Sequence, residues 1–140
     1  MHQPDRLSHR PMRRGLVLGA MLMAVAAAGC TRLFVDTPPK SVVFFNAFSA
    51  ELDAPAQGVI REFAADARTA PTRRVTVLGY ADAAGSPDAN RMLSALRAKV
   101  VADALVTQGI APNRISQRPR GATDTDPGIE SRRVEIELGR

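Results

Sequence analysis

The spacing of apolar residues changes several times along the chain. Residues 41–46 (SVVFFN) form a short continuous run of β-branched and aromatic side chains, which predicts a buried strand. Residues 73–80 (RRVTVLGY) predict a second strand, and residues 113–121 (NRISQRPRG) a short third one bounded by Pro119 and Gly121. In residues 132–138 (RRVEIEL) apolar and charged positions alternate strictly, which predicts a strand with one wet face.

Two segments between these strands have the period of a helix. In residues 53–70, Asp53 can cap the first turn, Pro55 suits that turn, and Pro71 marks the end. The predicted apolar face of this helix holds Val59, Ile60, Phe63, Ala64 and Ala67. Residues 90–105 (NRMLSALRAKVVADAL) predict a second helix, terminated by Gly109. The predicted apolar face of the second helix holds Leu93, Leu96, Val100, Val101, Ala104 and Leu105.

One charged residue lies inside the apolar face of the second helix. Arg97 is about 40° from Leu93 around the helix axis, and Asn90, seven residues earlier, lies almost above it. A guanidinium carries five donors and is costly to bury without partners. Arg97 therefore needs a partner or a ligand at the core side of this helix.

The order β-α-β-α-β-β predicts one sheet with helices packed on it. Both helices serve as crossovers, which favours parallel pairing among the early strands. The fold class we expect is α/β (α+β), with a single mixed sheet and two main helices packed on one face. The wet face of the last strand suggests that the other face of the sheet is left uncovered.

Residues 1–29 have the layout of a secretory signal of the lipoprotein type. A basic segment precedes an uncharged apolar run of 14 residues, 15–28 (GLVLGAMLMAVAAA). A helix needs about 20 residues to span a bilayer, so a cleaved signal is favoured over the alternative of a permanent span. Residues 30–40, which contain Pro38 and Pro39, predict a short extended linker.

Cys30 is the only cysteine of the chain and follows the apolar run. The sequence AAGC at residues 27–30 resembles a degenerate lipobox, which implies that Cys30 is lipidated. Thr31, in place of an Asp, implies sorting to the outer membrane, with the domain facing the periplasm. The alternative is ordinary cleavage after Ala28, which would leave a free thiol in an oxidising compartment. Lipidation accounts for the unpaired cysteine.

Composition removes several classes of function. The whole chain has a net charge of +5, but residues 31–140 hold 15 basic and 13 acidic residues, a net of +2. That balance gives little support for a nucleic-acid partner. His2 and His9 both lie in the signal, so the rest of the chain has no histidine for a nucleophilic triad or a zinc site.

Other cofactor motifs are also missing from the sequence. There is no phosphate-binding glycine motif. Residues 123–128 (TDTDPG) lack the further ligands of a calcium loop and predict a solvated turn. We expect no cofactor and no metal, and carboxylates alone remain for catalysis.

A long stretch of the chain matches one known family in register. Residues 75–116 closely resemble the OmpA-like C-terminal domain, whose signature runs G-[HY]-T-D-x-x-G and then N-x-x-L-S-x-x-R-A-x-x-V-x-x-x-L-x-x-x-G-I. The matching residues are Gly79, Tyr80, Asp82, Gly85, Asn90, Leu93, Ser94, Arg97, Ala98, Val101, Leu105, Gly109 and Ile110. With VVFFNAFSAEL and RRVEIEL as opening and closing strands, the resemblance covers residues 41–140. The whole is similar in arrangement to the peptidoglycan-associated lipoproteins.

This resemblance implies a non-catalytic protein that binds peptidoglycan and tethers the outer membrane to the wall. In the family, an Asp after the strand and an Arg fifteen residues later hold the diaminopimelate of the stem peptide, which implies Asp82 and Arg97 here. The chemistry agrees, because a guanidinium suits a carboxylate and an acid suits an ammonium. Asn90, an amide that can hydrogen-bond a peptide backbone, also matches a family binding position, and Ala81 stands at another. The weaker positions that the resemblance implies are Asn46 and one of Arg132 and Arg133.

Several of these residues have a simpler interpretation. Arg97 could pair with Asp82 as a structural salt bridge, and we expect an empty site to leave the two in contact. Asn90 could merely support the start of the helix. Arg132 and Arg133 could end a strand in solvent.

The chain also departs from the family pattern. Ala81 stands where the family has Thr, which removes a hydroxyl, and the segment between Gly121 and Arg132 is several residues shorter than usual. These departures favour an alternative function, a protein-interaction module of an envelope complex with weakened or lost peptidoglycan binding. A carboxylate-based hydrolase is a third class, but the sequence places no second acid beside Asp82.

Overall fold

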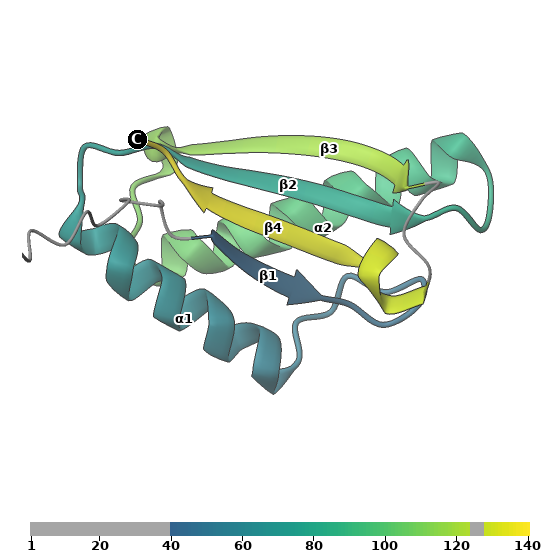
Figure 1. Ribbon diagram of the computed structural model, residues 1–140, viewed down its shortest axis with the longest axis horizontal. Helices are drawn as coiled ribbons and strands as arrows, with labels where there is room; N and C mark the ends of the chain where they lie inside the picture. Colours follow the sequence, from purple (N-terminus) through teal and green to yellow (C-terminus); the bar gives the residue numbers. More distant parts are fainter. Residues whose placement is uncertain (1–39, 124–127) are drawn as a thin grey trace, which may run out of the picture. The chain divides into compact units, whose positions relative to one another are not determined.

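The computed structural model describes residues 40–123 and 128–140. The predicted signal, Cys30 and most of the predicted linker lie outside the described residues. In chain order the elements are β1 (Lys40–Phe44), α1 (Ala54–Thr69), β2 (Val75–Asp82), α2 (Pro87–Thr107), the 3-10 turn η1 (Pro112–Arg114), β3 (Ile115–Thr123), the 3-10 turn η2 (Gly128–Ser131) and β4 (Arg133–Leu138). The predicted order of strands and helices is confirmed (Figure 1). Within the described ranges, no helix is both long enough and apolar enough to cross a membrane.

The four strands form one mixed sheet in the order β1-β4-β2-β3. β2 pairs with β3 in parallel, and β4 pairs antiparallel with both β1 and β2. The prediction of parallel pairing is therefore right for β2 and β3 and wrong for β1, because β4 lies between β1 and β2. The central place of β4 fits its alternation: Val134, Ile136 and Leu138 are all buried.

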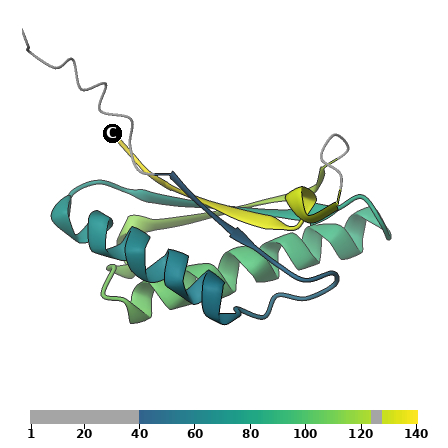
Figure 2. The same cartoon turned by 60° about the horizontal axis from the view of Figure 1, so that its bottom comes forward.

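Both long helices pack on the same face of this sheet, as Figures 1 and 2 show from two directions. The core between them is built from buried residues of α1, α2 and all the strands except β3. On the other face of the sheet, Lys40 Nζ lies 3.1 Å from Glu135 and 3.3 Å from Glu137. The prediction of two helices on one face and a charged, wet second face is confirmed.

β1 is an edge strand, whereas the sequence predicted a buried one. Its run of apolar residues ends at Phe44, which is 43% exposed, while Val43 is buried. Phe45 lies beyond the strand, is buried, and donates its backbone N–H to the Arg132 carbonyl at 2.8 Å. A continuous apolar run does not distinguish an edge strand from a central one.

β3 is longer than predicted and runs through Pro119 and Gly121. Proline is tolerated here because β3 is at the edge of the sheet, where a missing N–H need not break a ladder. Pro119 pairs with Gly79 and Gly121 with Tyr80, so Arg120 is an extra residue on β3 at this irregularity. Gly121 takes a φ of +72°, which favours glycine.

α2 starts earlier than predicted. Ser86 is its N-cap, since its hydroxyl accepts from Ala89 N at 3.2 Å, and Pro87 stands in the first turn. Its buried residues are Asn90, Ser94, Arg97, Ala98, Val101, Ala102 and Leu105. Leu96, which was predicted to face the core, is 51% exposed.

The buried face of α2 differs from the predicted one because the helix lies very close to β2. A Cβ on Gly79 would stand 2.1 Å from the Ser94 carbonyl oxygen and 3.1 Å from the Ala98 Cβ. Only small side chains fit along this line, so Ser94 and Ala98 point at the sheet and larger leucines turn outward. Arg97 consequently lies on the buried face of α2.

Candidate functional site

Arg97 is held by three backbone carbonyls. Its Nε donates to Ser49 O at 2.8 Å, Nη1 to Tyr80 O at 3.0 Å, and Nη2 to Asn46 O at 3.0 Å. Its guanidinium also lies over the ring of Phe45, 5.2 Å from the centroid. Arg97 thus joins α2 to the end of β2 and to the loop that follows β1. Three of its five N–H groups are used, which leaves two for another partner.

The expectation that an empty site leaves Arg97 in contact with Asp82 is wrong. Within residues 40–123 and 128–140 no hydrogen bond or ion pair joins the two side chains. The side chain of Arg97 is 0% exposed, and burial lowers its pKa to about 10, with the positive charge of Arg132 acting in the same direction. Arg97 therefore stays charged at neutral pH and depends on carbonyl dipoles for its stabilisation.

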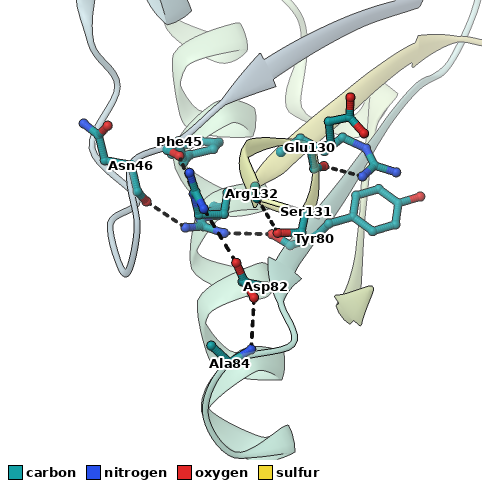
Figure 3. A network of polar contacts seen from close by, with 11 residues as sticks. Phe45, Asn46, Tyr80, Asp82, Ala84, Glu130, Ser131 and Arg132 are labelled. Atoms are coloured by element: carbon teal, nitrogen blue, oxygen red, sulfur yellow. Dashed lines mark hydrogen bonds and ion pairs between the residues drawn. The ribbon is translucent and has the colours of Figure 1, made fainter. Parts of the chain in front are cut away.

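Asp82 ends β2 and pairs with Arg132 instead. The two side chains point toward one another, with Arg132 Nη1 3.6 Å from Asp82 Oδ2 (Figure 3). The backbone N–H of Ala84 donates to Asp82 Oδ1 at 3.0 Å. This hydrogen bond, aided by the Ser131 hydroxyl and the charge of Arg132, holds the pKa of Asp82 below its usual value. Asp82 is thus an ionised carboxylate at the end of a strand.

These charged groups surround one small pocket. Its lining residues are Ala47, Phe48, Asp82, Ala84, Asn90, Leu93, Arg97 and Arg132. The cavity volume is about 20 Å³, which is enough for a water molecule but not for a ligand. The Asp82–Arg132 pair is only partly buried, with side-chain exposures of 38% and 22%. An exposed pair of this kind is weak, about 0–1 kcal/mol, so its separation is an easy way to enlarge the pocket.

Asn90 places its amide at the wall of the pocket, and neither amide atom is among the fully buried, unpaired side-chain atoms of the described residues. It is 6% exposed, and its side chain makes no hydrogen bond to any part of the chain that the structure describes. Its backbone N–H bonds to Ser86 O within the first turn of α2, and its side chain lines the pocket beside Asp82. The N-cap is Ser86, so the side chain of Asn90 is not needed to start the helix.

The remaining predicted residues take different places. Arg132 lines the pocket, whereas Arg133 turns away: its Nε donates to Glu135 at 2.8 Å and its guanidinium lies over the Tyr80 ring. Asn46 contributes its backbone carbonyl to Arg97 and does not line the pocket. Ala81 is fully buried and also lies outside the pocket. Cys30 lies outside the described residues.

The sequence analysis missed the loop of residues 46–49. Phe48 is 79% exposed, lines the pocket, and takes a φ of +55°. A positive φ is uncommon for a bulky residue, and strained residues of this kind cluster at ligand sites. Arg97 holds the loop through the carbonyls of Asn46 and Ser49 on either side of Phe48. An aromatic residue after the opening strand was the only signal in the sequence.

No group of three or more His, Cys, Asp or Glu side chains in the described ranges is placed to hold a metal ion. What this arrangement offers a ligand is a carboxylate, two guanidiniums and an amide, all around one hollow. Such a set can hold a small zwitterion by charge-assisted hydrogen bonds.

Comparison with known proteins gives one consistent result. The sequence matches the OmpA family over residues 44–133. It is 36% identical over 103 residues to a probable lipoprotein, YiaD, of Escherichia coli, a match that covers 69% of this chain and 47% of YiaD. It is 40% identical over 85 residues to the peptidoglycan-binding protein ArfA of Mycobacterium tuberculosis, covering 56% of this chain and 26% of ArfA. The chain thus spans about half the length of these relatives or less.

Solved structures share the fold. The peptidoglycan-associated lipoprotein of Burkholderia pseudomallei superposes with a TM-score of 0.66 at 21% identity, over 70% of this chain and 89% of that one. The OmpA-like domain of FopA1 from Francisella tularensis superposes with a TM-score of 0.65 at 28% identity, over 70% of each chain. The predicted mixed sheet with two helices is the fold of these domains.

Proposed function

Because the chain belongs to the OmpA family, we propose that it binds peptidoglycan without catalysis and holds the diaminopimelate of the stem peptide in the pocket beside Asp82. Its lipid anchor would be Cys30, and its place the outer membrane, with the domain facing the periplasm. It would then tether that membrane to the wall. The names of YiaD and ArfA, a probable lipoprotein and a peptidoglycan-binding protein, support this assignment.

One observation carries the proposal: an ionised carboxylate and two guanidiniums meet around a single pocket. The free end of diaminopimelate is an amino-acid head, which carries an ammonium and a carboxylate on the same carbon. Asp82 suits the ammonium, and the spare donors of Arg97 with Arg132 suit the carboxylate. A ligand with only one of these charges would leave part of the set without a partner.

Binding requires that the Asp82–Arg132 pair opens. In this structure the pair spans 3.6 Å and the cavity between the side chains is small. The ligand head would enter between the two partners, so that its ammonium replaces Arg132 at Asp82 while Arg132 takes the ligand carboxylate. Each charge keeps an opposite partner throughout, so little electrostatic free energy is lost on opening. Arg97, held by three carbonyls, stays in place as the floor.

The amide of Asn90 would bind the peptide backbone of the same ligand. It is buried, without a hydrogen-bonding partner in the described ranges, and lines the pocket. Its amide atoms are not fully buried, so a ligand group can take the place of water at this amide. Phe48 would cover the aliphatic chain of diaminopimelate, since its ring is exposed at the edge of the pocket.

A pull-down of the full chain with purified sacculi tests this function. We expect wild-type protein to be retained and Asp82→Asn to be retained at least tenfold less, because a charge-assisted hydrogen bond contributes about 1.5–3 kcal/mol. The matched control is Asp66→Asn, an exposed acid on α1 far along the chain from the pocket. Equal retention of both variants would refute the site.

The other functions have separate outcomes in the same experiment. If the wild-type protein does not bind sacculi but co-purifies with envelope proteins, the result would favour the function of a protein-interaction module. Release of soluble muropeptides from the sacculi would favour a hydrolase.

A further inference from the structure

A second hollow adjoins the pocket at the start of α2. Its cavity volume is about 320 Å³, within the range of about 300–1,000 Å³ for small-molecule sites. Its lining includes Asn90, Arg91, Arg120 and the backbone around Gly85 and Gly121. Asn90 also lines the first pocket, so its side chain is shared by the two. A ligand that fills the first pocket can extend past Asn90 into this hollow.

The amide of Asn90 faces this hollow. A Cβ on Gly85 would lie 3.7 Å from Asn90 Oδ1, so the amide is directed at the loop that lines the hollow. Asn90 is 6% exposed, and its side chain has no hydrogen-bond partner among the described residues. The amide atoms are not fully buried, so a polar ligand group that enters the hollow can replace water at this amide.

The bulge in β3 supplies one of the two arginines. Arg120 is the extra residue between Pro119 and Gly121, and the Gly121 N–H donates to Ser94 Oγ on α2 at 3.0 Å. This hydrogen bond fixes the bulge against the helix and so brings Arg120 to the first turns of α2. Bulges commonly re-aim a side chain in this way beside a site.

Among the described residues, one of the two arginines of the hollow has an ion-pair partner, at a long distance. Arg120 makes no hydrogen bond or ion pair within the described ranges. Arg91 approaches only Asp88, at 4.0 Å, with both side chains mostly exposed. Two exposed guanidiniums beside the N-terminus of a 21-residue helix create a positive potential, which favours an anion.

We propose that this hollow binds a second carboxylate of the same stem peptide, one residue away from diaminopimelate. The inference rests on the proposed function, because the first pocket must hold the diaminopimelate head for the neighbouring residue to reach Arg91 and Arg120. The stem peptide has two candidates: the free α-carboxylate of the D-glutamate before diaminopimelate and the C-terminal carboxylate of the D-alanine after it. Both present the same chemistry to the arginines.

Calorimetric titration of the full chain in detergent tests the inference, with the tetrapeptide L-Ala-γ-D-Glu-diaminopimelate-D-Ala as the probe. Two further peptides carry an amide in place of either the D-glutamate or the D-alanine carboxylate. We expect the variant with both Arg91→Gln and Arg120→Gln to bind the free peptide about fivefold more weakly than wild type, a size typical of two exposed ion pairs. One of the two amidated peptides should bind wild type about as weakly as the free peptide binds the variant. The same amidated peptide should bind the variant no more weakly than the free peptide does, and this coupling identifies the carboxylate that the arginines bind.

The control variant carries Arg61→Gln and Arg118→Gln. Both residues are exposed, one on α1 and one on β3, and neither lines the hollow. It loses the same net charge, so it should bind like wild type if long-range attraction is unimportant. Unchanged affinity of the Arg91/Arg120 variant, or losses equal to those of the control, would overturn the inference while the proposed function stands. No binding by wild type would overturn both.

Discussion

Two arginines at opposite ends of the sheet are held in the same manner. Arg97 donates to three backbone carbonyls beyond the ends of β1 and β2. Arg114, in η1, also donates to three: its Nε to Arg73 O at 2.9 Å, and its Nη2 to Ala67 O at 3.0 Å and Ala70 O at 2.9 Å. The three carbonyls that Arg114 binds lie where β2 and β3 begin and α1 ends. A guanidinium bound to three carbonyls is therefore a structural device of this fold and does not by itself indicate a ligand.

The difference between the two ends lies in what surrounds each arginine. Arg97 lines a pocket with Asp82, Arg132 and Asn90, whereas Arg114 lines none of the pockets described here. Arg97 is also fully buried, while Arg114 is only half-buried. The acid, the second arginine and the amide therefore distinguish the candidate site, and Arg97 adds its spare donors to them.

Substitution of each arginine by alanine should give the largest effects. Arg97→Ala removes a fully buried side chain and leaves three partly buried carbonyls without their donors, so we expect the free energy of unfolding to fall by about 3–5 kcal/mol. Arg114→Ala should cost about 1–3 kcal/mol, because the side chain that it removes is only half-buried. Urea denaturation followed by circular dichroism measures both.

Sacculus binding then separates the two ends. Sacculus binding is measured at a temperature where circular dichroism shows both variants folded. Arg114→Ala should then bind sacculi like wild type, and Arg97→Ala should not bind them. Equal binding by the two folded variants would mean that Arg97 is a structural arginine only.

The sequence located Arg97 better than it described its partners. Helical period placed it on the packed side of α2, and this is confirmed. Its partners are the backbone carbonyls of residues 46, 49 and 80. Because every residue type has a backbone carbonyl, no sequence pattern could predict these partners. The centre of the buried face was also misjudged, because Gly79 allows Ser94 and Ala98 to approach the sheet where leucines were expected.

Strand placement failed for a similar reason. The spacing of apolar residues and the positions of proline and glycine predicted the existence and type of every main element, and the order β-α-β-α-β-β is confirmed. They did not place β4 between β1 and β2, because pairing depends on which apolar faces fill the core together. Pro119 was taken as a strand boundary, but a proline is acceptable in an edge strand and the sequence does not say which strand is at the edge.

A smaller effect is expected at Phe48, whose backbone has a positive φ at the end of the sheet that holds the pocket. Its φ of +55° costs about 1–2 kcal/mol for a residue with a Cβ. Phe48→Gly removes this strain and loses little packing, since the ring is mostly exposed, so we expect the protein to become about 1 kcal/mol more stable. The same variant should bind sacculi several-fold more weakly, because the ring lines the pocket. Thermal unfolding and the pull-down measure the two effects, and unchanged binding would remove Phe48 from the site.

The smallest effect is the response to acid. The pKa of Asp82 is below its ordinary value of 3.8 because of the Ala84 N–H, the Ser131 hydroxyl and Arg132. A lowered carboxyl pKa means that its contribution to stability is complete above about 3.8 and is lost as the pH falls through the folded value. We expect binding of a stem peptide to be constant from about pH 8 to about pH 5 and to weaken only in stronger acid. A midpoint near neutral pH would contradict the assignment of Asp82 as the ammonium partner.

The central claim is that the pocket recognises an amino-acid head with both of its charges. Two stem peptides that differ only at the third residue, diaminopimelate or L-lysine, test it most directly by calorimetric titration against the full chain in detergent. L-Lysine keeps the ammonium and lacks the carboxylate. We predict that the diaminopimelate peptide binds at least tenfold more tightly, and that Arg132→Gln removes this preference while Arg61→Gln keeps it. Equal affinity of the wild-type protein for the two peptides would contradict the account.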